Sequence, residues 1–154
     1  KAAEITDATI AALRRGGLRH GRINYANGDM VGHTGHLDAA VIAVEAVDLS
    51  LARIIPVIEK TNGALIVTAD HGNADEMFEL DKKSGDFKRD PQGRRRSKTS
   101  HTLNEVPCYI YVPSRPSLQL SPNLEHPGIA NVAATTLQLL GFERPEGYEP
   151  SILR

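Results

Sequence analysis

The sequence has 154 residues and a formal net charge of −1, with 18 Lys and Arg against 19 Asp and Glu. One domain is the default at this length, and such a chain can bury enough apolar surface to fold without disulfides or structural metals. The balanced charge argues against binding to nucleic acid or to a membrane surface, and no apolar run reaches the roughly 20 residues of a membrane span. No signal peptide is visible, and a single cysteine, Cys108, cannot form an internal disulfide, so the sequence predicts a cytoplasmic protein. The chain begins at Lys1 without an initiator Met, which suggests a piece of a longer protein.

The first predicted elements are a short helix and a short strand. The helix is expected over residues 6–15, with Thr6 as its N-cap and Gly16 at its stop. Residues 22–26 alternate apolar and polar side chains, which is typical of a strand. The next ten residues, 27–36, contain three glycines and clustered polar groups, which indicates a functional loop or turn rather than a packed element.

A long helix is predicted from Leu37 to about Lys60, because apolar residues recur there every three or four positions. Pro56 lies inside this pattern, so a kink or an early end is expected at that point. Residues 64–68 are a compact, β-branched run typical of a buried strand. Strand, helix and strand in this order predict a right-handed βαβ unit, and therefore a parallel strand pair in an α/β sheet.

The second half of the chain is more polar. Residues 79–100 carry many charges and predict an exposed polar loop, since charge runs are usually solvated. Residues 106–112 predict a third strand, and a proline-rich loop follows it. Residues 129–140 predict an amphipathic helix that ends at Gly141.

Three clusters place an oxygen or imidazole donor where a predicted strand meets a loop. Asp29 and His33 would share one face if the turn between them is helical, which is the geometry that a single metal ion needs. Asp70 and His71 follow the second strand, but neighbouring residues of an extended chain point opposite ways, so their spacing leaves open whether both reach one ion. His101 precedes the third strand. Each pattern is also common by chance, and a single histidine in this setting is more often a polar loop residue than a ligand.

Placement is what favours a metal site over chance. The first two clusters follow the strands of one predicted βαβ unit, so they would emerge at the same carboxyl edge of the sheet, where α/β proteins place their sites. The pattern therefore predicts a metal-dependent α/β enzyme. The other histidines (His20, His36 and His126) have no partner cluster and are interpreted as surface or packing residues.

Three long stretches occur in order along most of the chain: NYANGDMVGHTGHLDAAVIAVEAVD, LIVTADHGNADEM and SHTLNEVP. They resemble the carboxyl-terminal part of cofactor-independent phosphoglycerate mutases, which belong to the alkaline phosphatase superfamily. For residues 1–154, the resemblance implies a portion of a three-layer α/β/α domain with a mostly parallel sheet that is incomplete in this chain. It also implies interconversion of 3-phosphoglycerate and 2-phosphoglycerate through a phosphoserine intermediate, a step of glycolysis and gluconeogenesis.

The resemblance also implies a two-metal site. Carried over by position, Asp29, His33 and His101 would bind one divalent ion, and Asp70 and His71 would bind a second. Manganese is the usual ion of the family, with zinc or cobalt as alternatives. Mixed imidazole and carboxylate donors suit such a metal better than calcium, which prefers oxygen throughout.

The family's nucleophilic serine, a further metal-binding aspartate and the substrate-binding domain have no counterpart in these residues. We therefore assign no catalytic residue and expect a fragment that is inactive alone and that could pair with another copy through an exposed sheet edge. Phosphoglycerate would bind only in the longer enzyme. Two alternatives stay open: another phosphomutase or phosphohydrolase of the superfamily, or a stand-alone metal-binding module without catalysis.

Overall fold

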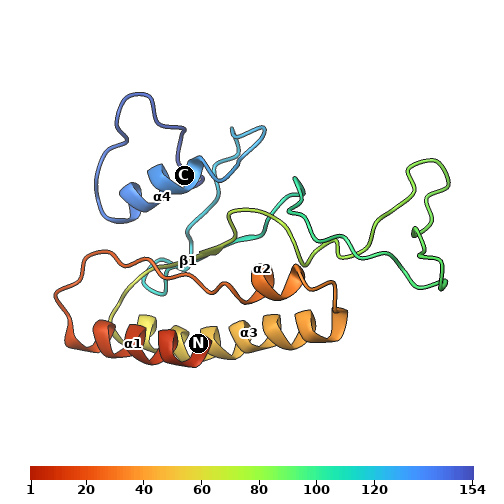
Figure 1. Cartoon of the computed structure of the whole chain (residues 1–154). Helices are drawn as coiled ribbons and strands as arrows, with labels where there is room; N and C mark the ends of the chain where they lie inside the picture. Colours follow the sequence, from red (N-terminus) through yellow and green to blue (C-terminus); the bar gives the residue numbers. More distant parts are fainter.

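The computed structural model describes residues 1–154, with helical segments on both sides of a narrow sheet (Figure 1). Its elements, in chain order, are α1 (Ala2–Arg15), α2 (Asn27–Gly32), α3 (Leu37–Lys60), β1 (Leu65–Thr68), β2 (Cys108–Tyr111) and α4 (Asn131–Leu139). In Figure 1, α1, α2 and α3 lie on one side of the strands, and α4 lies on the other. This arrangement agrees with the predicted α/β class. None of the four helices has both the length and the apolar character needed to cross a membrane.

The sheet has two antiparallel strands, β1 and β2, with Leu65 opposite Tyr111. The predicted parallel pair is therefore wrong for this chain, because residues 22–26 form no strand. Their alternating side chains fit a strand, but a strand also needs hydrogen bonds to a neighbouring backbone, and residues 22–26 make none to β1 or β2. β1 pairs only with β2, and its other edge has no partner within residues 1–154.

Helix α1 begins earlier than predicted, at Ala2, so Thr6 is not its N-cap. Thr6 lies inside the helix, fully buried, and its hydroxyl donates to the Ala2 carbonyl at 2.8 Å. The same oxygen is 2.7 Å from the Tyr25 hydroxyl, which fastens the segment before α2 to α1. The predicted end is confirmed, since Gly16 follows the helix with a φ of 73° that favours glycine.

Helix α3 spans the predicted residues and passes Pro56 without ending early. The proline removes one helical hydrogen bond, but the residues next to it, Ile54, Val57 and Ile58, are buried and hold this part of the helix in place. The helix ends at Lys60, and two residues further on Asn62 has a left-handed φ of 51°. Beyond it, the Gly63 N–H donates back to the Ile58 carbonyl at 2.9 Å.

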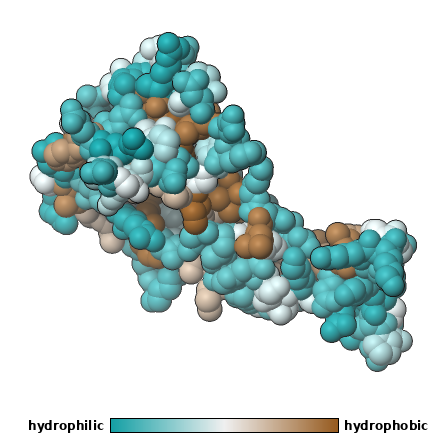
Figure 2. Space-filling view, turned by 90° about the horizontal axis from the view of Figure 1, so that it is seen from above, coloured by the Kyte–Doolittle hydropathy of each residue, from teal (hydrophilic) through white to brown (hydrophobic).

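The chain buries little of its apolar surface, with 16 of its 154 residues classed as buried. One small core lies along α3, and another joins α4 to the last residues, where Ala134 and Leu153 are buried. Several large apolar side chains of α3 stay exposed, namely Val41, Ile42, Val44 and Leu49. Figure 2 shows apolar patches open on the body of the molecule. Length alone therefore predicted a larger core than this chain forms.

Residues 78–98, here called the arm, project from the body (Figure 1). The sequence predicts an exposed polar loop over residues 79–100, and within it three short stretches are joined by backbone hydrogen bonds. The Glu79 N–H donates to the Arg96 carbonyl, the Lys88 N–H to the Glu79 carbonyl, and the Arg96 N–H to the Lys88 carbonyl. The Arg95 guanidinium lies over the Phe87 ring at 4.5 Å and near the Phe78 ring at 5.5 Å. The arm is mostly exposed, and it has a small packed centre of its own.

Candidate metal centre

The short helix α2 places Asp29 and His33 on one face. The His33 N–H donates to the Asp29 carbonyl at 3.1 Å, so the two residues are one helical turn apart. The sequence predicts this segment as a loop or turn, in which Asp29 and His33 share a face only if the turn is helical. The structure shows that the turn is helical. This turn allows the carboxylate and the imidazole to reach the same point.

His101 reaches that point because the segments after β1 and before β2 are tied together. The Thr102 N–H donates to the Gly72 carbonyl at 2.8 Å, and the two residues form an isolated antiparallel bridge. Thr102 is buried at this junction. The bridge therefore places His101 beside His71, although the two residues are thirty positions apart in the sequence.

Asp29, His33 and His101 converge on a single point. The Asp29 Oδ1 atom lies 3.1 Å from the Nε2 atom of His33 and 3.1 Å from the Nε2 atom of His101. The two Nε2 atoms are 3.2 Å apart. Ligand atoms that surround a divalent ion at about 2.1 Å are about 3.0 to 3.4 Å from one another. The donor types and their spacing therefore fit a divalent metal ion.

The orientation of His33 also suits a ligand. Its Nδ1 atom lies 2.6 Å from the Thr99 carbonyl oxygen, which can only accept a hydrogen bond. Nδ1 therefore donates to this carbonyl, and Nε2 is the ring atom that faces Asp29 and His101. A backbone carbonyl on the far nitrogen is a common support of metal-binding imidazoles.

The carboxyl group of Asp29 is kept ionised. Burial raises its pKa, but the hydrogen bond from Asn73 and the nearby His33, His101 and His71 outweigh burial, so the pKa lies below its usual value. The Asn73 Nδ2 group donates to Asp29 Oδ1 at 2.9 Å. A negative oxygen is thus available among the imidazoles.

The second predicted pair is less closely assembled. The His71 ring stacks on the His101 ring at 3.7 Å and 16°, and the donor atoms of Asp29, His71 and His101 lie within 4.8 Å of one another. The Asp70 side chain is 80% exposed, and its Oδ1 atom is 3.7 Å from His71 Nε2. Four of the five predicted ligands therefore come together, while Asp70 lies at the margin.

Sequence reasoning did not single out Asn73 or the Thr99 carbonyl. In the sequence, the only signal for Asn73 is its place two residues after His71 in the HGN stretch. The structure adds that its side chain is buried, at 5% exposure. Spacing cannot reveal a backbone carbonyl as a partner, because every residue carries one.

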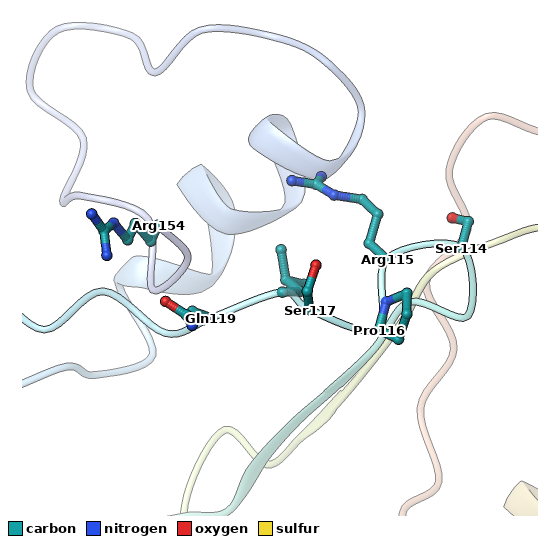
Figure 3. Close-up of a pocket in the computed structure, with 7 residues that line it drawn as sticks. Ser114, Arg115, Pro116, Ser117, Gln119 and Arg154 are labelled. Atoms are coloured by element: carbon teal, nitrogen blue, oxygen red, sulfur yellow. The ribbon is translucent and has the colours of Figure 1, made fainter.

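A shallow hollow lies elsewhere on the surface, next to the C-terminal residues (Figure 3). Arg115 and Arg154 line it, but their guanidinium groups lie apart and do not converge on one point (Figure 3). None of the predicted ligands lines this hollow.

Comparison with known proteins identifies relatives for the whole chain. The model of the Metalloenzyme superfamily matches residues 1–144. A probable 2,3-bisphosphoglycerate-independent phosphoglycerate mutase of Leptospira interrogans is 51% identical over 154 residues, which are 100% of this chain and 28% of that protein. The 2,3-bisphosphoglycerate-independent phosphoglycerate mutase of Trypanosoma brucei brucei is 47% identical over 99% of this chain and 28% of its own length.

A solved structure shares the fold. The crystal structure of Leishmania mexicana phosphoglycerate mutase at low cobalt concentration matches with a TM-score of 0.94 and 49% identity, over 99% of this chain and 28% of that one. The resemblance drawn from the three sequence stretches is thereby confirmed, and the chain spans about 28% of the length of these relatives. With its family model covering residues 1–144, the chain belongs to the metalloenzyme superfamily.

Proposed function

We propose that these residues are the metal-binding part of a cofactor-independent phosphoglycerate mutase, which interconverts 3-phosphoglycerate and 2-phosphoglycerate. The observation that carries the proposal is the convergence of Asp29, His33 and His101, with contacts of 3.1 to 3.2 Å. The names of the relatives support the choice of reaction, since similar chains from a bacterium and a trypanosome are called phosphoglycerate mutases.

In this proposal, Asp29 Oδ1, His33 Nε2 and His101 Nε2 hold one divalent ion. Asp70 and His71 supply part of a second site. Manganese is the proposed ion, with zinc or cobalt as alternatives that the same donors accept. Two such ions, when bound, stabilise the charge on a transferring phosphoryl group and lower the pKa of an attacking hydroxyl.

The residues of this chain act mainly by orientation. The Thr99 carbonyl holds the proton of His33 on Nδ1 at 2.6 Å, and so keeps Nε2 free. The bridge between Gly72 and Thr102 holds His101 near His71. Both contacts hold donors from separate segments close together. The donor side chains therefore lose little conformational freedom when the phosphorylated substrate binds.

We assign the nucleophilic serine and the groups that hold the glycerate to a longer polypeptide, because the relatives are far longer than this chain. The exposed apolar side chains of α3, such as Val41 and Ile42, support this assignment. The exposed free thiol of Cys108 fits the reducing cytoplasm in which we place the enzyme.

The test uses the complete reading frame that contains these residues. Its product, supplied with Mn²⁺ and no 2,3-bisphosphoglycerate, is expected to convert 3-phosphoglycerate to 2-phosphoglycerate. Asp29→Ala should abolish turnover, while His36→Ala, a change at an exposed histidine outside the cluster, should leave it unchanged. Residues 1–154 alone should show no turnover.

Other results would contradict the proposal. Release of inorganic phosphate without isomerisation would indicate a phosphohydrolase of the same superfamily. Conversion of a different sugar phosphate would indicate another phosphomutase. A reading frame that encodes only these residues would favour a metal-binding module without catalysis.

A further inference from the structure

The side chain of Asn73 serves the candidate metal centre from outside the predicted ligand set. It is 5% exposed, and it follows His71 in the turn after β1. Its Nδ2 group lies 2.9 Å from Asp29 Oδ1 and 3.4 Å from the Asp29 carbonyl oxygen. One amide therefore contacts both the side chain and the backbone of the residue at which the three donors meet.

The other end of the same amide has no partner. Asn73 Oδ1 is buried, with no hydrogen bond to any group of the chain. Buried polar atoms are nearly always paired, and the exceptions cluster where a group is held for a purpose other than stability. The amide keeps its N–H on Asp29 although its oxygen gains nothing, so the contact with Asp29 determines where the side chain lies.

Gly32 makes this position possible. A Cβ atom at residue 32 would lie 2.2 Å from Asn73 Oδ1 and 2.9 Å from its Cγ atom. No larger residue fits there unless the amide moves. The last residue of α2 thus leaves room for the Asn73 side chain from the turn after β1.

The chemistry of an amide suits this task better than that of a charged donor. A carboxylate oxygen accepts more than one hydrogen bond, so Asp29 Oδ1 can take the Asn73 N–H and still face the two imidazoles. A lysine or arginine in the same place would compete with a metal ion for the negative charge. A neutral donor orients the carboxylate and leaves its charge free.

We propose that Asn73 is a positioning residue, which holds the Asp29 carboxylate toward His33 and His101 so that the three donors form a ready metal site. Gly32 is the second half of this device, because it provides the space for the amide. The inference rests on the metal site proposed above, but not on the identity of the substrate.

The test measures Co²⁺ binding to the metal-free protein in its longest available form, by calorimetry and by the visible absorption of bound cobalt. Loss of an outer partner of a metal ligand typically lowers metal affinity by about 10- to 100-fold. Asn73→Ala should show a decrease in this range, with a changed cobalt spectrum. Gly32→Ala should do the same, because its methyl group would displace the amide.

The double variant separates positioning from general destabilisation. Once Asn73 is alanine, the methyl group of Gly32→Ala no longer meets the amide, so the double variant should bind Co²⁺ about as well as Asn73→Ala alone. If the two substitutions acted independently, their fold-losses in Co²⁺ affinity would instead multiply in the double variant. This readout does not depend on activity.

Asn131→Ala is the matched control. Asn131 is also 5% exposed, and its amide donates to the Pro150 carbonyl and accepts from the Gly128 N–H, each at 2.7 Å, on the far element α4. Its loss should lower the melting temperature and leave Co²⁺ affinity unchanged. Asn131→Ala and Asn73→Ala with equal effects on affinity would overturn the positioning role.

Two further outcomes distinguish the inference from the proposal beneath it. If the unsubstituted protein binds Co²⁺ and Asn73→Ala binds it equally well with the same spectrum, the positioning role is wrong while the ligand set stands. If the unsubstituted protein shows no Co²⁺ binding, the proposed ligand set is wrong, and the role of Asn73 with it.

Discussion

The two predicted ligand pairs after the segments 22–26 and 64–68 differ in how completely this chain assembles them. Asp29 and His33 lie on one helical turn, with their donor atoms 3.1 Å apart. Asp70 and His71 are neighbours in a loop, with donor atoms 3.7 Å apart and the Asp70 side chain 80% exposed. Adjacent residues in a loop cannot orient one another as residues one helical turn apart do, so the second pair depends on other segments for its geometry.

His101 connects the two pairs, because its Nε2 atom contacts Asp29 while its ring stacks on His71. We therefore expect two sites of unequal completeness. The first has its three donors close together, and the second, with Asp70 and His71, lies next to it against the His101 ring.

The largest effect is expected at Asp29, the meeting point of the first set. Asp29→Ala removes the oxygen that both imidazoles face, so Co²⁺ affinity should fall by more than the roughly 100-fold that the loss of an outer partner can cost. Calorimetric titration of the metal-free protein measures this. An affinity close to that of the unsubstituted protein would show that Asp29 is not a ligand.

A smaller but clear loss is expected at His33. His33→Ala removes one nitrogen donor and leaves the other two, so the affinity should fall at least as far as it does on loss of an outer partner, by about 10-fold or more. His36→Ala is the control, since His36 is an exposed histidine three residues further along the chain, and its hydrogen bonds go to Thr34 and Ala40 and not to a predicted ligand. Equal losses in both variants would mean that the effect comes from α2 and α3 and not from a ligand.

The second pair should respond differently. In residues 1–154, Asp70→Ala is expected to leave the affinity for the first ion within about twofold, because the exposed carboxylate takes no part in that set. The matched comparison is Asp29→Ala in the same titration. A large loss from Asp70→Ala would show that the two pairs form a single site and would remove the difference described above.

The smallest expected effect concerns the support of His101. Burial raises the pKa of Asp75, but hydrogen bonds from Asn104 and Thr102 outweigh it, so the pKa lies below its usual value. A carboxyl group with a lowered pKa stabilises the fold at neutral pH, and this contribution disappears as the pH falls through the folded-state pKa. Thermal unfolding should show a lower melting temperature for Asp75→Asn near pH 7 and a smaller difference below about pH 4. A constant difference across this range would exclude a role for the charge.

The sequence predicted α3 and the face that Asp29 and His33 share in a helical turn, whereas the segment that forms α2 was predicted only as a loop or turn. The 3.6-residue period fixes α3, and a carboxylate and an imidazole four positions apart predict a shared face once the turn is helical. The structure meets that condition in α2. The resemblance supplied the grouping of ligands, which spacing alone left open.

The failures concern long-range pairing. Residues 22–26 have the side-chain pattern of a strand, but a strand exists only beside another backbone, and the pattern contains no information on whether one is present. The arm likewise depends on contacts between its own runs, such as Arg95 on Phe87, which composition does not reveal. Asn73 was missed because its role comes from a segment 44 residues away.

The measurement that tests the central claim most directly is a crystal structure of the protein grown with Co²⁺, with anomalous diffraction recorded at the cobalt edge. The account predicts a peak at about 2.0 to 2.2 Å from Asp29 Oδ1, His33 Nε2 and His101 Nε2. A cobalt peak elsewhere on the chain, or no peak at these three atoms under saturating cobalt, would contradict it.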